Sequence, residues 1–500
     1  MALQNEVFSA LSYATSNGFQ IHPDAFAMLK GLQSDILKIV QDIIKTKRQS
    51  KNSTILVEDI KSLLRPEKVE AGPSEQISKV LMDPTPEVTT GEGVEGYAAL
   101  FRSRFEKLMR VLSQRPESKR ISKIASVKQN LRNGNSTLNP EARGRPVRNG
   151  PTTLVAGLLM SRRQKKNGIE LAIDDHTGIL SVMAITEDTR KQAASLALDQ
   201  MVMLELETGR KGMQGTATVK NVVTPDIPDH LPNRSRSESY AILISDLHVG
   251  SKHFMDSEFS HFLEWLSSTE DEIVSKIKFL CFAGDLVDGI GIYPNQDKEL
   301  IEMDAEKQMN RALRLLAKVP KHIKIFVIPG NHDPGRRALP QPSISNNELE
   351  EQLQHLENCK MLGNPALLEL NGVKVLMYHG QSLDDVIATT PGLSYAKPAE
   401  AMKVLLKARH LAPTYGARTP IAPEQEDMMV ISEVPDILHS GHVHVVEMQN
   451  YKGTLIVNSG AWQRQTNFQQ TMGITPTPGI GILVNLATLQ PFIKDFNQNQ

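Results

Sequence analysis

Apolar residues recur at helical spacing in the first 65 residues, at positions that include Phe8, Leu11, Met28, Leu32, Ile36, Val40 and Ile43. A further short helix is predicted at residues 54–64. We therefore expect residues 1–65 to form a small all-helical N-terminal domain. The pattern fits a docking module and a stabilising cap equally well.

The apolar periodicity lapses between residues 66 and 150. Residues 66–96 carry seven acids against two lysines, whereas residues 101–148 carry 13 Lys or Arg against three Glu. Such a composition buries too little apolar surface to fold alone, so a flexible linker is predicted, first acidic and then basic. The basic half is a candidate contact for nucleic-acid phosphates, although a solvated tether fits the composition at least as well.

Short β-prone runs separated by turn signals follow at residues 151–230, among them IELAIDD and ILSVMAI. This spacing predicts a small β-barrel, with an OB-fold as the first choice. OB-folds that bind single strands stack the bases on aromatic side chains, and residues 152–225 contain no Phe, Tyr or Trp. A structural or protein-binding barrel is therefore favoured.

From about residue 238 to residue 500, apolar runs alternate with helical segments, which is typical of a layered α/β domain, here a β-sandwich flanked by helices. Five of these runs end in polar residues that can bind metal. In chain order, these residues are Asp246 and His248; Asp285 and Asp288; Asn331, His332 and Asp333; His379; and His442 and His444. Open α/β sheets place their ligand sites at the carboxyl ends of strands, so we expect one shared site.

The composition narrows the chemistry of that site. Only two cysteines occur in 500 residues, which excludes a disulfide framework and a thiolate metal site. A metal would be held by His, Asp, Glu or Asn, and this mixture favours Mn, Fe or Zn over Mg or Ca. The net charge of −1 argues against a wholesale polyanion binder. The sequence shows no membrane span or signal peptide, so a cytoplasmic location is expected.

The spacing within the motifs favours a dinuclear site. Residues two apart in an extended segment face the same way, so Asp246 can share a metal with His248, and His442 and His444 can both face the site. About seven candidate ligands are too many for one ion. Glycines flank the ligands where the chain must turn sharply or approach closely, namely Gly284, Gly330, Gly380 and Gly441. A lone His or Asp is ordinarily a core or turn residue, but the ordered set of five motifs is not explained in that way.

This ordered set resembles the motifs of the calcineurin-like metallophosphoesterases. The resemblance implies one metal held by Asp246, His248 and His444, a second held by Asn331, His379 and His442, and Asp285 bridging both. It also implies that His332 faces the scissile phosphate without binding metal, with Asp288 or Asp333 as its orienting partner. Two divalent ions, Mn²⁺ first and Fe or Zn as alternatives, would activate water for in-line attack on the phosphate.

The domain order and several further stretches resemble the small subunits of the archaeal family-D DNA polymerases. The stretches are SDLHVGSKHF at 245–254, FAGDLVDGIGIYP at 282–294, RHLAPTYGARTPIAPE at 409–424, VPDILHSGHVH at 434–444 and NSGAWQRQT at 458–466. The resemblance implies a 3′→5′ proofreading exonuclease that acts on single-stranded or mismatched DNA ends. It further implies a complex with a separate large subunit that carries out polymerisation. Residues 1–65 could meet that subunit, a sliding clamp or neither.

Two other interpretations stay open. A stand-alone phosphatase for proteins or small phosphoesters would carry the same metal motifs, although it has no need of the barrel and the basic segment. A catalytically silent scaffold would not need every ligand position filled. Five residues near the motifs are candidate DNA contacts, against an ordinary solvated or core role for each: Lys252, Arg336 and Arg337 for phosphates, and Tyr293 and Trp462 for a terminal base.

Overall fold

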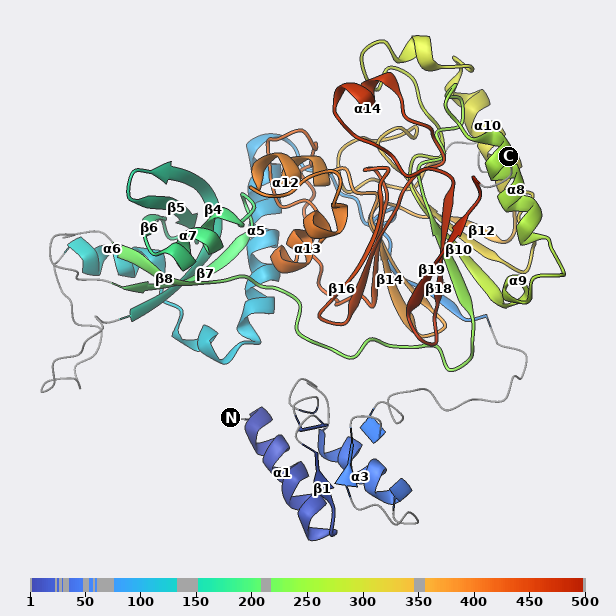
Figure 1. Ribbon diagram of the computed structural model, residues 1–500. Helices are drawn as coiled ribbons and strands as arrows, with labels where there is room; N and C mark the ends of the chain where they lie inside the picture. The colour runs from blue at the N-terminus through green and yellow to red at the C-terminus, as the bar shows by residue number, and fades with distance from the viewer. Residues whose placement is uncertain are drawn as a thin grey trace, which may run out of the picture.

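The computed structural model describes residues 2–22, 25–26, 29, 36–47, 54–56, 59–60, 76–132, 152–207, 217–345 and 356–497. Figure 1 shows a small N-terminal unit, a barrel and a larger α/β domain. Within these ranges, no helix combines the length and the apolarity that a membrane crossing requires.

The N-terminal unit differs in part from the prediction. Helices α1 (Ala2–Ser16) and α3 (Ile36–Lys47) are present, and the buried side chains of α3 include Ile36, Val40 and Ile43. However, β1 (Gln20–Ile21) and β2 (Thr54–Ile55) pair as a two-stranded parallel sheet, so the unit is not all-helical. Residues 54–55 are strand where a helix was predicted, because Ile55 is buried beside Ile21. Met28 and Leu32 lie outside the described residues.

The linker prediction is wrong for residues 76–132, which are folded. Strand β3 (Ser78–Met82) pairs antiparallel with β13 (Ala366–Leu370) at the edge of a sheet in the α/β domain. Helices α5 (Gly93–Ser113), η1 (Pro116–Arg120) and α6 (Ile124–Arg132) follow. Every fourth residue of α5 is buried, in the series Gly96, Leu100, Arg104, Leu108 and Leu112. Most of the basic side chains in the described part of this segment therefore lie on the outer surface of packed helices. The remaining linker residues, 66–75 and 133–150, lie outside the described residues.

Five strands between residues 152 and 223 form a closed barrel with the order β4-β5-β6-β8-β7. The strands are β4 (Thr152–Lys165), β5 (Gly168–Asp174), β6 (Ile179–Ala184), β7 (Met201–Glu207) and β8 (Ala217–Val223). Strand β4 closes the barrel because it pairs with both β5 and β7. Helix α7 (Glu187–Ala194) connects β6 to β7. The predicted small barrel is present, and its finer assignment as an OB-fold stays a prediction.

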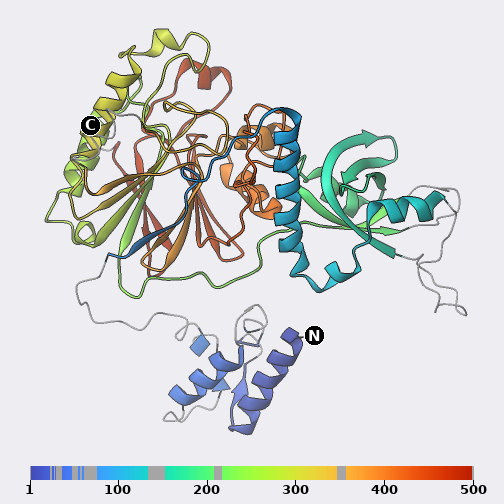
Figure 2. The same ribbon diagram turned by 180° about the vertical axis from the view of Figure 1, so that it is seen from behind.

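The α/β domain contains two six-stranded sheets. The first has the order β12-β11-β10-β9-β18-β19, with strands Cys359–Met361, Lys324–Ile328, Ile277–Ala283, Tyr240–Ile244, Ile480–Asn485 and Gln490–Asp495. The second has the order β16-β17-β15-β14-β13-β3, and its strands not yet given are Val446–Tyr451, Thr454–Ser459, Ile437–Ser440 and Val373–Met377. Figure 2 shows the same two sheets from behind.

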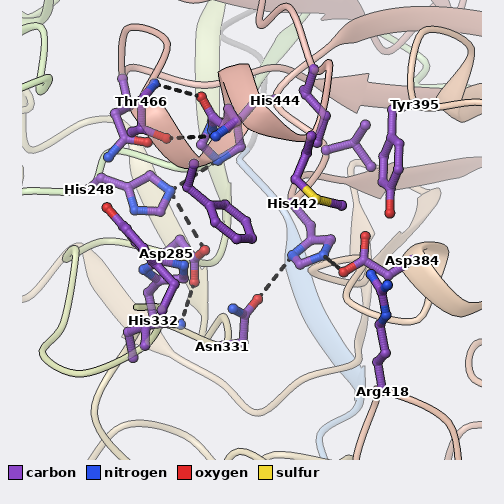
Figure 3. Close-up of a pocket in the computed structure, with 18 residues that line it drawn as sticks. His248, Asp285, Asn331, His332, Asp384, Tyr395, Arg418, His442, His444 and Thr466 are labelled. Atoms are coloured by element: carbon purple, nitrogen blue, oxygen red, sulfur yellow. Dashed lines mark hydrogen bonds and ion pairs between the residues drawn. The ribbon is translucent and has the colours of Figure 1, made fainter. Parts of the chain in front are cut away.

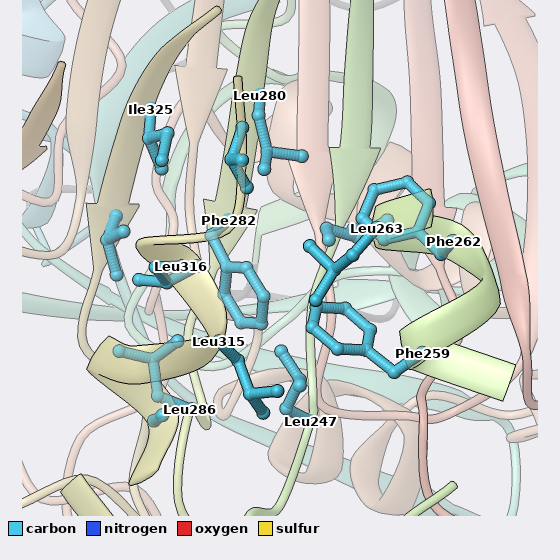
Figure 4. Close-up of a cluster of buried hydrophobic side chains, with 14 of the residues drawn as sticks. Leu247, Phe259, Phe262, Leu263, Leu280, Phe282, Leu286, Leu315, Leu316 and Ile325 are labelled. Carbon is cyan, nitrogen blue, oxygen red and sulfur yellow. The ribbon is translucent and has the colours of Figure 1, made fainter. Parts of the chain in front are cut away.

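Apolar side chains on both faces of the sheets produce the layers. One buried cluster joins the inner faces and includes Leu243, Cys281, Met377 and Val457. On the outer face of the first sheet, α8 (Asp256–Leu266) and α10 (Ala305–Leu316) pack against strand side chains (Figure 4). Helices α12 (Leu383–Thr389) and α13 (Pro398–Ala408) belong to the cluster on the second sheet. This is the layered α/β arrangement that the sequence predicted.

The direction of the strands brings the motifs together. Strands β9, β10 and β11 run parallel in the first sheet, and β14 and β15 run parallel in the second. The five polar motifs follow the carboxyl ends of these five strands. The shorter helices α9 (Glu272–Lys276), η2 (Gln296–Glu299) and α14 (Asn467–Thr471) lie in the connections.

Candidate metal centre

The turns that carry the candidate ligands have an unusual backbone. The φ angle lies between 55° and 67° at Asp246, His248, Asp285, His442 and His444. A non-glycine residue in this left-handed region costs about 1–3 kcal/mol, and such residues concentrate at functional sites. Most of the motif side chains line one cavity of about 320 Å³ (Figure 3). The fold therefore maintains five strained residues, in three turns, at one place.

Asp246, His248 and His444 form a first group. The Nε2 atom of His444 lies 3.1 Å from Nε2 of His248 and 3.3 Å from Oδ1 of Asp246. His248 Nε2 lies 3.8 Å from the same oxygen. A cation with ligand bonds of about 2.0–2.2 Å holds its ligands about 3.0–3.5 Å apart, so this triangle fits around one ion with little adjustment.

Asn331, His379 and His442 form a second group. Oδ1 of Asn331 lies 3.0 Å from Nε2 of His379 and 3.0 Å from Nδ1 of His442. His379 Nδ1 donates a hydrogen bond of 2.8 Å to the carbonyl of Ala283, which leaves the lone pair of Nε2 directed at the group. Figure 3 shows the Asn331 amide facing the His442 ring.

Asp285 lies between the two groups. Its Oδ2 atom is 3.7 Å from Nε2 of His248 in the first group and 3.3 Å from Nε2 of His379 in the second. All seven residues predicted as metal ligands are thus brought together, and the carboxylate of Asp285 lies within 3.7 Å of a histidine in each group. Within the described ranges, every group of three His, Cys, Asp or Glu side chains close enough to share an ion draws on these residues, and one group also includes His332.

Two carboxylates orient the histidines from behind. Oδ1 of Asp288 lies 3.0 Å from Nδ1 of His248, and Oδ2 of Asp384 lies 3.2 Å from Nε2 of His442. Such outer contacts fix the ring and its tautomer. Sequence reasoning missed Asp384, since its only signal is an acidic pair five residues after His379.

Three buried carboxylates, those of Asp246, Asp285 and Asp288, have a pKa below the ordinary value, and the neighbouring histidines offset their charge. Burial would raise the pKa of Asp246, but hydrogen bonds with His248 and His444 hold that pKa well below its ordinary value. Burial lowers the pKa of His248, yet Asp246 and Asp288 together raise it to about 10. Burial also lowers the pKa of His379, but the negative charge of Asp285 opposes this effect, and the pKa of His379 rises to about 9. Ionised carboxylates at the centre of a buried histidine cluster attract a divalent cation.

Two glycines let the chain approach these carboxylates. A Cβ atom at Gly330 would lie 2.0 Å from Oδ1 of Asp285, and a Cβ at Gly441 would lie 2.2 Å from Oδ2 of Asp246. No side chain fits at either position without displacing a candidate ligand. The predicted close approach at these two glycines is therefore present.

His332 lines the cavity beside the two groups. Its Nδ1 atom donates a hydrogen bond of 2.7 Å to the backbone carbonyl of Asp288, and its backbone N–H donates to Oδ1 of Asp285 at 2.9 Å. The carboxylate of Asp333 instead accepts the backbone N–H groups of Val287 and Gly330, at 3.1 and 2.8 Å. The contact to the His332 ring thus comes from the carbonyl of Asp288, whereas the contacts of the Asp333 carboxylate stabilise the two turns.

Most of the suggested DNA contacts have other partners. Trp462 is fully buried against Phe259 and Phe262, so its proposed stacking on a base is wrong. Arg336 pairs with the buried carboxylate of Glu424 at 2.6 Å. Lys252 Nζ donates to the carbonyl of Lys298, and Arg337 is exposed. Tyr293 does line the cavity.

Known proteins are similar to the α/β domain and, in several cases, to most of the chain. A family model for the B subunits of DNA polymerases alpha and epsilon matches residues 241–445. The DNA polymerase II small subunit of Pyrococcus horikoshii is 39% identical over 438 residues, which cover 84% of this chain and 67% of that protein. The DNA polymerase II small subunit of Thermoplasma acidophilum is 31% identical over 494 residues, which cover 98% of this chain and 93% of that protein. The alignment thus spans about two thirds of the Pyrococcus relative and nearly all of the Thermoplasma one.

Among solved structures, the chain is similar to an archaeal phosphodiesterase. The match covers 51% of this chain and 98% of the phosphodiesterase, with 10% identity and a TM-score of 0.26.

Proposed function

Because this chain belongs to the family of archaeal DNA polymerase II small subunits, we propose that it is the 3′→5′ exonuclease subunit of a replicative DNA polymerase. The observation that supports this proposal is the convergence of seven Asp, Asn and His side chains from five strand ends in one cluster, five of which line one cavity. We propose that nucleotide addition belongs to a large subunit in the same complex, of two or more chains. A sliding clamp is a further candidate partner.

In this proposal Asp246, His248 and His444 hold one divalent cation, and Asn331, His379 and His442 hold the other. The carboxylate of Asp285 would contribute to both. The distances within each group and the buried negative charge fit cations of this kind, with Mn²⁺ first and Fe or Zn as alternatives. When bound, the pair supplies an activated water and neutralises charge on the phosphate.

His332 acts on the leaving oxygen. Burial lowers the pKa of its ring to about 4, so at neutral pH the free protein holds a single ring proton, on the Nδ1 atom that donates to Asp288. A phosphodiester in the cavity adds negative charge, which favours a second proton, on Nε2. From there His332 donates this proton to the 3′-oxygen as the P–O bond breaks, and water supplies the new P–O bond. The products are a 5′-mononucleotide and a strand shortened by one residue.

His332→Ala is expected to lower the rate of hydrolysis by about 10²- to 10⁴-fold and to leave metal binding intact, because His332 assists proton transfer and holds no metal. Single-turnover rates on a labelled oligonucleotide, together with metal analysis, measure the two effects. The matched control is His322→Ala, since His322 precedes β11 at the end away from the cavity. Full hydrolysis by His332→Ala would remove His332 from the reaction.

Incubation of the full chain with Mn²⁺ and 3′-labelled DNA tests the proposed function. Stepwise release of mononucleotides from single-stranded or mismatched ends is the expected result. Cleavage of p-nitrophenyl phosphate with intact DNA would instead indicate a phosphatase for small phosphoesters. Inertness toward both substrates would indicate a scaffold subunit.

A further inference from the structure

The cavity has an apolar wall that the metal groups do not use. Beside the histidines and carboxylates, its lining includes the apolar side chains Ile292, Tyr293, Val443, Phe468, Met472 and Ile474. The polar side chains Asp384, Tyr395 and Arg418 lie together beside His442 (Figure 3). A site that bound only a phosphate would need no apolar wall.

Two aromatic rings form the centre of that wall. The rings of Tyr293 and Phe468 are stacked, with centroids 5.3 Å apart and planes inclined at 28°. The Tyr293 centroid lies 6.2 Å from that of His332, so the stack begins directly beside the residue assigned to the leaving oxygen. Phe468 is 44% exposed, which leaves a large part of its ring open to a ligand.

The two rings are held in place by buried polar contacts. Oε2 of Glu299 accepts a hydrogen bond from the Tyr293 hydroxyl at 3.3 Å, and its Oε1 accepts the backbone N–H of Asn467 at 3.3 Å. Glu299 is 7% exposed. Thr466 and Gln469 complete a capping box at the start of α14, which fixes the turn that presents Phe468. The aromatic wall is therefore positioned before any substrate binds.

We propose that Tyr293 and Phe468 form a binding site for the base of the 3′-terminal nucleotide, the nucleotide that hydrolysis releases. This inference rests on the proposed function. A base has a flat π-face, and its stacking on an aromatic ring is favourable and tolerant of sequence. A cavity of about 320 Å³ is near the lower limit of about 300–1,000 Å³ for small-ligand sites, so it accommodates one nucleotide and not a base pair.

The proposed site selects DNA 3′ ends by the free energy needed to separate the terminal base from its partner and its stack. Only the terminal residue can enter as a free chain end, because the preceding residue continues into the strand outside. A paired terminal base must first leave its partner and its stack, whereas a mismatched or single-stranded base pays less of that cost. Discrimination between correct and incorrect ends then requires no readout of base identity.

The test compares Phe468→Leu with wild type in the full chain, on single-stranded oligonucleotides that carry an abasic residue at the terminal position, at the penultimate position or nowhere. Loss of the stack is expected to raise KM for the unmodified strand about 5- to 100-fold. The same substitution should raise KM similarly when the penultimate base is missing, and should have little further effect when the terminal base is missing. Phe492→Leu is the matched control, because Phe492 is also 44% exposed but lies on β19.

Three outcomes would overturn the base site: an unchanged KM in Phe468→Leu, an equal effect on all three strands, or an effect that disappears only when the penultimate base is missing. Binding of the labelled strands in the presence of a chelator gives a second readout that is independent of hydrolysis, with the same expected pattern. Failure of the wild-type chain to cleave any of the strands would instead count against the proposed function itself. The two failures are therefore distinguishable.

Discussion

Asp285→Asn is expected to reduce hydrolysis of a 3′-labelled oligonucleotide by at least about 10³-fold and to lower the number of divalent ions bound per chain. The Asp285 carboxylate lies between the two groups, at 3.7 Å from His248 and 3.3 Å from His379. Its replacement removes a negative charge from both cation positions at once. We expect this to reduce the rate more than removal of one neutral hydrogen-bond donor from an active site does. Asparagine keeps the size of the side chain and an oxygen that can accept the His332 backbone N–H.

The control for this substitution is Asp256→Asn, because Asp256 lies on helix α8, is exposed and pairs with Arg311 at the surface. We expect this variant to keep its activity and its bound metal. Metal content by mass spectrometry and circular dichroism would accompany the rates, to separate loss of metal from loss of fold. An Asp285→Asn chain that remained folded and cleaved DNA at the wild-type rate would contradict the dinuclear assignment.

Arg104→Ala is expected to destabilise the protein by about 3–5 kcal/mol, because it leaves a buried carboxylate without its cation. Arg104 is fully buried on helix α5, and its Nε donates to Oδ2 of Asp427 at 2.7 Å. Its Nη1 donates to the carbonyl of Pro413 at 2.7 Å, and His410 Nε2 lies 3.0 Å from the same Asp427 oxygen. These contacts attach α5 to the α/β domain.

Thermal unfolding at pH 7 measures this effect, with Arg110→Ala as the control from the exposed face of the same helix. The charge of Asp427 is fully present at that pH. Burial would raise the pKa of Asp427, but His410 and Arg104 hold it well below its ordinary value. The contribution of this pair is thus present above the unfolded pKa of about 3.9 and is lost as acid protonates Asp427. Equal melting temperatures for the two variants would show that α5 is not attached in this way.

The cluster of candidate ligands could be predicted from the sequence because its signal is local. Each candidate ligand follows directly after an apolar run, and the parallel order of strands brings such positions to one edge. Phe468 and Asp384 carry no comparable signal. The contact of Tyr293 with Phe468 depends on Glu299 joining two loops that lie far apart in the chain.

The predictions that proved wrong concern residues whose partners in the folded chain cannot be identified from the sequence pattern. Trp462 follows a strand end and was a candidate for stacking on a base, but its ring lies among the core aromatic residues. Arg336 is neutralised by Glu424, which is 88 residues further along the chain. In α5, surface charges concealed a buried stripe with four-residue spacing. Strand β3 is only five residues long and pairs with β13, nearly 300 residues away.

Anomalous scattering from crystals of the full chain grown with Mn²⁺ would show whether one site holds two cations. We expect two peaks, one among Asp246, His248 and His444 and one among Asn331, His379 and His442, with Asp285 near both. A single peak with no space for a second ion, or ligand side chains directed away from one another, would contradict this expectation.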